Sequence, residues 1–161
     1  MKRLILPVIV LVVICFAVFL LFKKGPFTKG EEAFKAGDYE TAATMFRECV
    51  DKAKRETAST LYLARIEGIN GKYAEGIALC DKAIEEHPKR PDPYFFKAIL
   101  LQLNGDMSAA EKVVDKFSNM PQTGKSFLVA RITRPHISGP GKELRPEEVA
   151  ARMQLLQGNL E

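Results

Sequence analysis

The order of apolar and polar residues divides this chain into a continuous apolar run at its start and a mixed pattern after it. The run, LILPVIVLVVICFAVFLLF, covers residues 4–22 and contains no charge. As a helix it is about 28 Å long, close to the thickness of the hydrocarbon core of a bilayer. We predict that residues 1–24 form a single-span membrane anchor with basic flanks, in which residues 4–22 contact lipid.

A cleaved signal peptide is the alternative interpretation of this run. The apolar region of such a peptide usually has about 7 to 15 residues and is followed by small residues at the cleavage site. Here the run is longer and ends in Leu20, Leu21 and Phe22, directly before two lysines. Cys15 follows the bulky Ile14, which argues against lipoprotein processing. We therefore expect an uncleaved signal anchor.

After the anchor, Gly37, Gly71 and Gly105 recur at intervals of 34 residues. The positions around these glycines repeat as well. Two residues later come Tyr39, Tyr73 and Met107, then the small residues Ala42, Gly76 and Ala110, then the apolar residues Phe46, Cys80 and Val114. A glycine that ends a helix, a ring that fills the turn and a small residue where two helices touch are typical of a helical hairpin. The interval therefore predicts a repeated hairpin.

These residues resemble the tetratricopeptide repeat family, which shares G-x-Y, a small residue three past the tyrosine, an apolar residue four further on and a closing proline such as Pro88. The resemblance covers residues 25–124 and implies an all-α fold, a solenoid of three stacked hairpins. The three units are residues 23–56, 57–90 and 91–124. No unit has a tryptophan at its fourth position, and Met107 replaces the ring in the third. Because Thr28 and Glu31 match a capping box, we expect the first helix to begin near Lys29.

Beyond the repeats the pattern predicts three further segments. Residues 125–134 include SFLVARITR and suit a capping helix that covers the last repeat. Residues 135–145 are rich in proline and glycine and are expected to form a loop. Residues 146–161 are the C-terminal segment, in which we expect an amphipathic helix that begins at Pro146 and runs to about Gln157. Its apolar stripe consists of Val149, Met153 and Leu156. We expect this stripe to dock on the solenoid, either as a permanent cap or as a displaceable plug.

The net charge of +4 comes entirely from the anchor region, since the first 24 residues hold four basic residues and no acid. Without a broad basic face, we expect no nucleic-acid binding. Lys2 and Arg3 favour a cytoplasmic N-terminus and a soluble domain exported to the periplasmic side of a bacterial inner membrane. The lysines after the span favour the alternative, a domain that faces the cytoplasm; they are Lys23, Lys24, Lys29 and Lys35.

The residues that carry catalytic or metal chemistry are few and poorly placed for it. His87 and His136 are isolated, and no cysteine pair has the spacing of a metal site. Cys49 and Cys80 fall on repeat core positions, so we expect free, buried thiols. The GKS at residues 124–126 lacks the strand and the first glycine of a phosphate-binding loop. We expect neither an enzyme nor a protein that binds a metal or cofactor.

In the tetratricopeptide family the first helix of each unit lines a concave groove, and the resemblance implies such a groove here. Its residues would be Phe27, Glu31, Leu61, Arg65, Phe95, Ile99 and Gln102. Some members bind a C-terminal carboxylate through lysine and asparagine at the positions of Phe27 and Glu31, so that clamp is absent. What remains is an apolar groove with one central cation, suited to an amphipathic helix or an extended segment of a protein partner. The alternative is that these side chains pack only against neighbouring helices.

The predicted function is a membrane-tethered protein–protein interaction scaffold, or an assembly factor for a membrane-associated complex. Two alternatives stay open. One is a permanent structural subunit of a membrane complex, in which residues 4–22 pack against other spanning helices. The other is an enzyme or lipid-handling protein, which the composition and motifs disfavour.

Overall fold

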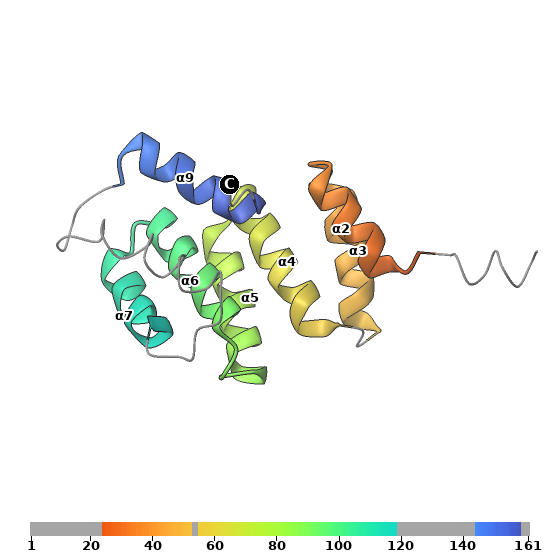
Figure 1. Ribbon diagram of the computed structural model, residues 1–161, viewed down its shortest axis with the longest axis horizontal. Coiled ribbons are helices and arrows are strands. Elements are labelled where there is room, and N and C mark those ends of the chain that lie inside the picture. The colour runs from red at the N-terminus through yellow and green to blue at the C-terminus, as the bar shows by residue number, and fades with distance from the viewer. Residues whose placement is uncertain (1–23, 53–54, 119–143, 159–161) are drawn as a thin grey trace, which may run out of the picture.

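A computed structural model describes residues 24–52, 55–118 and 144–158 (Figure 1). Its helices are α2 (Pro26–Lys35), α3 (Tyr39–Asp51), α4 (Glu56–Ile69), α5 (Tyr73–Glu86), α6 (Pro91–Leu103), α7 (Met107–Ser118) and α9 (Pro146–Gln157). These described ranges contain seven helices and no strand, so the predicted all-α class is confirmed for them.

Three sequence predictions fall outside the described residues. They are the apolar run of residues 4–22, the capping helix of residues 125–134 and most of the loop of residues 135–145. Within the described ranges, none of the helices combines the length and apolar character needed to cross a bilayer.

Successive helices pair into three antiparallel hairpins, α2 with α3, α4 with α5 and α6 with α7. The hairpins follow one another along the length of the molecule (Figure 1), because α3 packs on α4 and α5 packs on α6. The helix α9 lies across this row and contacts α4 and α6. Two segments that are distant in sequence, α4 and α9, are therefore neighbours in space.

Each hairpin turn has the same hydrogen-bonded geometry. Gly37, Gly71 and Gly105 have φ values of 80°, 77° and 85°, in the left-handed region that favours glycine. In the first turn the Gly37 N–H donates to the Phe34 carbonyl and the Asp38 N–H donates to the Ala33 carbonyl. The other two turns repeat both bonds at the equivalent positions, and this pattern is the Schellman motif of helix ends. The sequence period thus corresponds to a repeated turn.

The second helix of the first and third hairpins begins with an aspartate cap. Asp38 Oδ1 accepts from the Thr41 N–H at 3.1 Å, and Asp106 Oδ1 accepts from the Ala109 N–H at 3.0 Å. The hydrogen bond from Thr41 lowers the pKa of Asp38. Each cap satisfies one of the donors that a helix start leaves unpaired.

The start of the first helix differs from the prediction. We expected a capping box at Thr28, but α2 begins at Pro26, and Gly25 is its N-cap without a side-chain hydrogen bond. Proline suits this position because its fixed φ matches the helix and its missing N–H would be unpaired there anyway. The glycine–proline pair therefore sets the helix start, and Thr28 lies exposed within the first turn.

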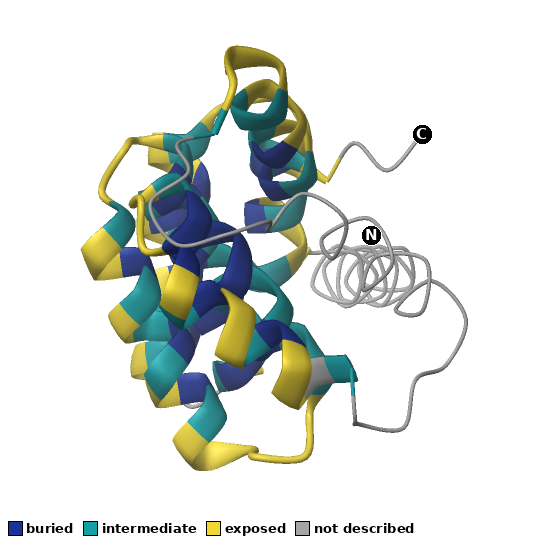
Figure 2. Cartoon of the chain, turned by 90° about the vertical axis from the view of Figure 1, so that its left-hand side faces the viewer, coloured by how far each residue is buried: buried dark blue, intermediate teal, exposed yellow. Residues whose placement is uncertain are grey.

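Small residues allow the helices to approach closely, and the buried residues gather between them (Figure 2). Ala42, Ala64 and Ala110 are fully buried. A Cβ atom on Gly30 would lie 2.9 Å from the ring of Phe46, and one on Gly76 would lie 2.8 Å from the Ala64 carbonyl oxygen. Larger side chains at these positions would separate the helices.

Candidate functional site

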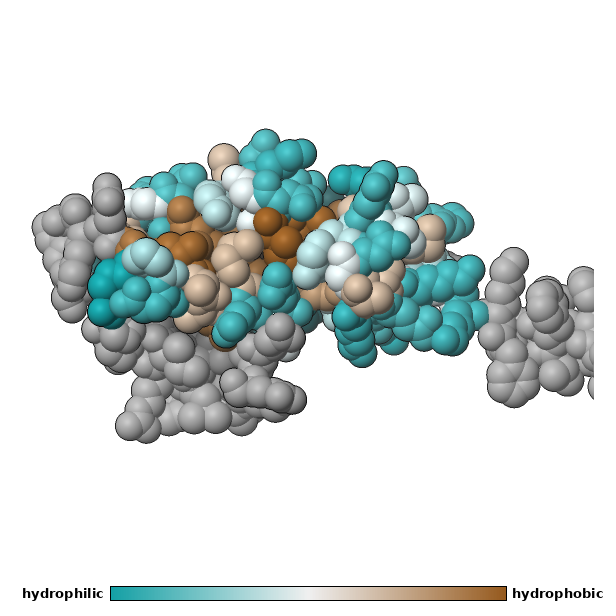
Figure 3. Space-filling model, turned by 90° about the horizontal axis from the view of Figure 1, so that it is seen from above, coloured by the Kyte–Doolittle hydropathy of each residue, from teal (hydrophilic) through white to brown (hydrophobic). Residues whose placement is uncertain are grey.

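The helix α9 packs its apolar side on α4 and α6. Leu156 is fully buried and belongs to one core cluster with Leu61, Ile99 and Leu100. Met153 and Leu155 are partly buried against the same cluster. Seen from the side on which α9 lies, apolar residues gather in the middle of the molecule with polar residues around them (Figure 3). The helix α9 therefore packs against Leu61 and Ile99, two of the predicted groove residues.

Gly68 of α4 makes room for Leu156. A Cβ atom built on Gly68 would lie 3.0 Å from Cδ1 of Leu156 and 2.4 Å from Cδ2 of Leu100. The distance to Leu100 is shorter than carbon atoms tolerate and the distance to Leu156 is tight, so a larger residue would displace Leu100 and press on α9. The absence of a side chain at this position thus leaves room for both Leu100 and Leu156.

Arg65 of α4 caps the C-terminal end of α9. Its Nε donates to the carbonyl oxygen of Leu156 at 2.7 Å. The last carbonyl groups of a helix have no partner within the helix and carry a partial negative charge, so a guanidinium stabilises them. Gly158, the C-cap of α9, has a φ of 88°, and a Cβ atom there would lie 2.9 Å from Arg65 Nη2. Glycine therefore permits both the turn and the close approach of Arg65.

Aromatic rings from three helices surround the guanidinium of Arg65. Its Cζ lies 4.4 Å from the ring centroid of Phe34 on α2, 5.0 Å from that of Tyr62 on α4 and 5.1 Å from that of Phe96 on α6. Such cation–π contacts hold a guanidinium in place without an acidic partner. Burial lowers the pKa of Arg65, but the ordinary value for arginine is so high that the group stays charged at neutral pH.

A second arginine, Arg152, belongs to α9 itself and contacts α6. It is only 5% exposed. Its Nε donates to Gln102 Oε1 of α6 at 2.7 Å, and its Nη1 donates to the backbone carbonyl of Glu148 at 3.0 Å. Arg152 Nη2 and Gln102 Nε2 are both buried without a hydrogen-bond partner. Burial lowers the pKa of Arg152, while the charge of Glu148 acts in the opposite direction.

We call the surface of α4 and α6 that holds α9, formed around Arg65, Gly68 and Gln102, the α9-binding surface. It provides an apolar contact for a leucine, a cation for helix carbonyls and an amide for a polar side chain. Its apolar part excludes water, which strengthens the two polar contacts at its edges.

Beside this surface, the rings of Phe27, Phe46 and Tyr62 from the first two hairpins pack together. The rings of Phe46 and Tyr62 stack at 4.4 Å, and Phe27 meets them edge-on at 5.6 and 6.0 Å. The Tyr62 hydroxyl donates to Glu31 Oε1 at 3.1 Å. Burial, followed by the charge of Glu31, raises the pKa of Tyr62. Arg55 lies over the ring of Phe27 at 4.6 Å.

The predicted groove residues fall into two groups. Leu61, Ile99 and Gln102 are buried, and Arg65 is partly buried by α9, so these four are covered in this conformation. Phe27, Glu31 and Phe95 are half-buried. Leu61 and Ile99 share their core cluster with Leu156 of α9 and also with Cys80 and Leu100, so both α9 and the neighbouring hairpin helices cover them. In α9 itself Leu156 is buried, Met153 is partly buried against the core and Val149 is half-buried.

Four residues of this region were missed by the sequence analysis: Tyr62, Gly68, Phe96 and Arg152. Arg152 could have been found, because it lies three residues after Val149 and four before Leu156, on the apolar stripe of α9. Phe96 and Tyr62 directly follow the predicted groove residues Phe95 and Leu61, but adjacent residues of a helix point in different directions, so the predicted stripe does not include them.

No protein-family model and no curated protein matches this chain. The resemblance to the tetratricopeptide repeat family therefore continues to depend on the repeated residues alone.

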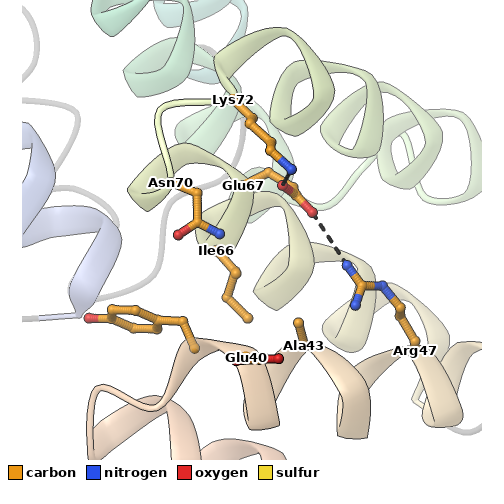
Figure 4. Close-up of a pocket in the computed structure, with 8 residues that line it drawn as sticks. Glu40, Ala43, Arg47, Ile66, Glu67, Asn70 and Lys72 are labelled. Atoms are coloured by element: carbon orange, nitrogen blue, oxygen red, sulfur yellow. Dashed lines mark ion pairs between the residues drawn. The ribbon is translucent and has the colours of Figure 1, made fainter.

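A second concave feature lies between α3 and the turn that joins α4 to α5 (Figure 4). It is a pocket of about 220 Å³ whose lining includes Tyr39, Ile66 and Glu67. The Glu67 carboxylate pairs with Arg47 at 3.6 Å and with Lys72 at 3.8 Å. Both cations of the lining are thus paired with the same carboxylate.

The described residues include no group of three or more histidine, cysteine or acidic side chains arranged to hold a metal ion. The thiols of Cys49 and Cys80 are free and fully buried. Burial raises the pKa of Cys80 to about 12, so this thiol is protonated at neutral pH. A protonated, inaccessible thiol is a poor nucleophile.

Proposed function

We propose that this protein is a membrane-tethered scaffold that binds a protein partner, or an assembly factor for a membrane-associated complex. Its fold would be a solenoid of three repeats similar to tetratricopeptide repeats. The observation that carries the proposal is the docking of α9, because the surface of α4 and α6 accommodates an amphipathic helix through apolar, capping and amide contacts.

In this proposal the protein performs recognition without chemistry. Burial of leucine-sized side chains yields about 1.5 to 3 kcal/mol each, and two or three such anchors suffice for a specific helix in a groove. The cation of Arg65 adds direction, because it favours the C-terminal end of a helix over its N-terminal end.

The anchor of residues 4–22 would confine the domain to the membrane plane and raise its encounter rate with membrane partners. The domain would be exported, with the N-terminus in the cytoplasm. A reporter enzyme fused after Glu161 tests this arrangement. A reporter that works only in the periplasm should be active, and a reporter that works only in the cytoplasm should be inactive.

The proposal is tested by photocrosslinking in the intact membrane. A photoreactive phenylalanine analogue at Phe95, which lies half-buried on α6, should give an adduct of defined mass with one partner. The same analogue at Glu85, an exposed residue of α5, is the matched control. Equal adducts from both positions, or none from either, would contradict the proposal.

Solubilisation in mild detergent separates an assembly factor from a permanent subunit. An assembly factor should be recovered at much less than one copy for each partner molecule, because it leaves the finished complex. Recovery in a fixed one-to-one ratio would support a structural subunit instead.

A further inference from the structure

Arg65, which caps α9, has ring contacts that come from outside α9. The three rings that surround the Arg65 guanidinium come from α2, α4 and α6. None of them belongs to α9, so these ring contacts do not require α9 to be docked. A cation held in this way is preorganised for any helix end that presents free carbonyl groups.

The polar contact of α9 is incomplete. When α9 docks, Arg152 loses water around its charge and Nη2 gains no protein partner. Gln102 is left with a buried Nε2 that donates to nothing. Buried donors without acceptors oppose docking, whereas both groups would be hydrated with α9 released. The contact between Arg152 and Gln102 thus weakens the docking of α9, whereas Leu156 and the cap from Arg65 stabilise it.

A different side chain at the Arg152 position would satisfy Gln102 fully. The Gln102 amide offers one acceptor, which α9 uses, and one donor group, which α9 leaves unused. A glutamine on the docked helix can accept from Nε2 and donate to Oε1 at the same time. It also brings no charge into the interface.

We propose that α9 is an exchangeable occupant of the α9-binding surface, which accepts a partner helix of matching chemistry. This inference rests on the proposed function. The partner helix places a leucine over Gly68 and directs its last carbonyl groups at Arg65. Four residues before the leucine it carries glutamine in place of arginine, and its last turn has no basic residue that would repel Arg65. In the free protein α9 inhibits partner binding by occupying the surface.

The test uses a fluorescent peptide with the sequence of residues 144–158 and the full-length protein in detergent micelles. Its binding to the wild-type protein is compared with binding to Leu156→Ala, in which the protein's own α9 is weakened. Because an occupied surface lowers the apparent affinity by the unoccupied fraction, the peptide should bind Leu156→Ala at least about tenfold more tightly. Val113→Ala, a partly buried position on α7, is the matched control and should bind the peptide like the wild type.

The chemistry of the partner is tested on the peptide itself. A peptide with Arg152→Gln should bind Leu156→Ala about tenfold more tightly than the parent peptide, since it removes the buried charge and pairs the Gln102 amide. Adding Arg65→Met to the protein should weaken both peptides by about tenfold. Equal affinity of the two peptides would overturn the proposed partner chemistry.

A measurement on the wild-type protein tests the proposal even if the variants do not fold. Amide hydrogen exchange of residues 149–157 in the wild-type protein should proceed through local release of α9, well before residues 60–66 of α4 exchange. Exchange of both segments only on global unfolding would overturn the exchangeable role of α9. These results leave crosslinking from Phe95 untouched, so a failure of the exchange proposal is distinguishable from a failure of the proposed function.

Discussion

At the scale of single residues, Arg65 contacts aromatic rings of all three described hairpins and also binds α9. Its side chain contacts rings on α2, α4 and α6, and its Nε donates to α9. One cation thus links four helices, although it has no acidic partner among the contacts that the structure gives it.

Replacing this cation should therefore destabilise the protein. We predict that Arg65→Met lowers the free energy of unfolding by about 2 kcal/mol, through loss of the helix cap and the ring contacts. The change is measured by urea denaturation. Arg47→Met is the control: its side chain is exposed and its ion pair with Glu67 is long, so it should change stability by less than about 1 kcal/mol. Equal losses would show that Arg65 has no special role.

Cys80 makes stability depend on alkaline pH. Its pKa is raised from 9.0 to about 12 by burial, so the folded state holds a proton that the unfolded state releases above pH 9. The stabilisation is complete below pH 9 and is lost as the pH rises toward 12. We predict a fall of up to about 1.4 kcal/mol per pH unit in this range. Denaturation from pH 8 to 11 should show a shallower slope in Cys80→Ala; an identical slope would contradict the assignment.

At the scale of helices and turns, the repeated glycines could be predicted from sequence and the start of α2 could not. The period located three turns because each needs a residue at positive φ, and glycine fills that requirement visibly. The bounds of α9 also followed from its proline and its apolar stripe. The start of α2 was misplaced because Pro26 competes with the capping residue Thr28, and local sequence does not say which dominates.

The turn at Gly71 allows a conformational cost to be measured without a steric one. Its φ is 77°, and a Cβ atom there would meet nothing within 4 Å. Gly71→Ala should therefore cost about 1 to 2 kcal/mol from backbone strain alone. Gly71→Asn should cost less, because asparagine tolerates the left-handed region. Thermal denaturation of the two variants checks the order, and a larger loss for asparagine would contradict it.

The pair of Arg152 and Gln102 tests whether α9 is held less tightly than it could be. We predict that Arg152→Met with Gln102→Leu raises the free energy of unfolding by about 1 to 3 kcal/mol, because apolar side chains replace an incompletely bonded polar pair. Gln102→Leu alone should destabilise, since it leaves the buried guanidinium without its acceptor. Urea denaturation of both variants measures this, and a destabilised double variant would show that the polar pair stabilises α9 docking.

At the scale of the whole molecule, the sequence predicted the three successive hairpins that the structure shows, whereas the partner groove remains a prediction. The sequence did not identify the ring stack around Arg65 or the amide contact of Arg152. Both depend on side chains from helices far apart in sequence, such as Phe34 and Phe96, whose meeting is fixed only by the packing angles between hairpins. The repeat frame specifies which helices are neighbours, whereas the tertiary packing decides which of their faces meet.

The molecule that results is a row of helical hairpins with one of its own helices on the surface proposed for a partner. In this arrangement a partner helix would compete with α9 for the α9-binding surface. The affinity of a partner would then depend as much on how weakly α9 is held as on the partner's own contacts.

The most direct test of this account combines partner capture with release of α9. The yield of the partner adduct from a photoreactive analogue at Phe95 should be measured in membranes for the wild type, for Leu156→Ala and for the control Val113→Ala. If α9 and the partner share one surface, the yield should rise several-fold in Leu156→Ala and stay unchanged in Val113→Ala. An unchanged or lower yield in Leu156→Ala would contradict the claim that α9 and the partner share one surface.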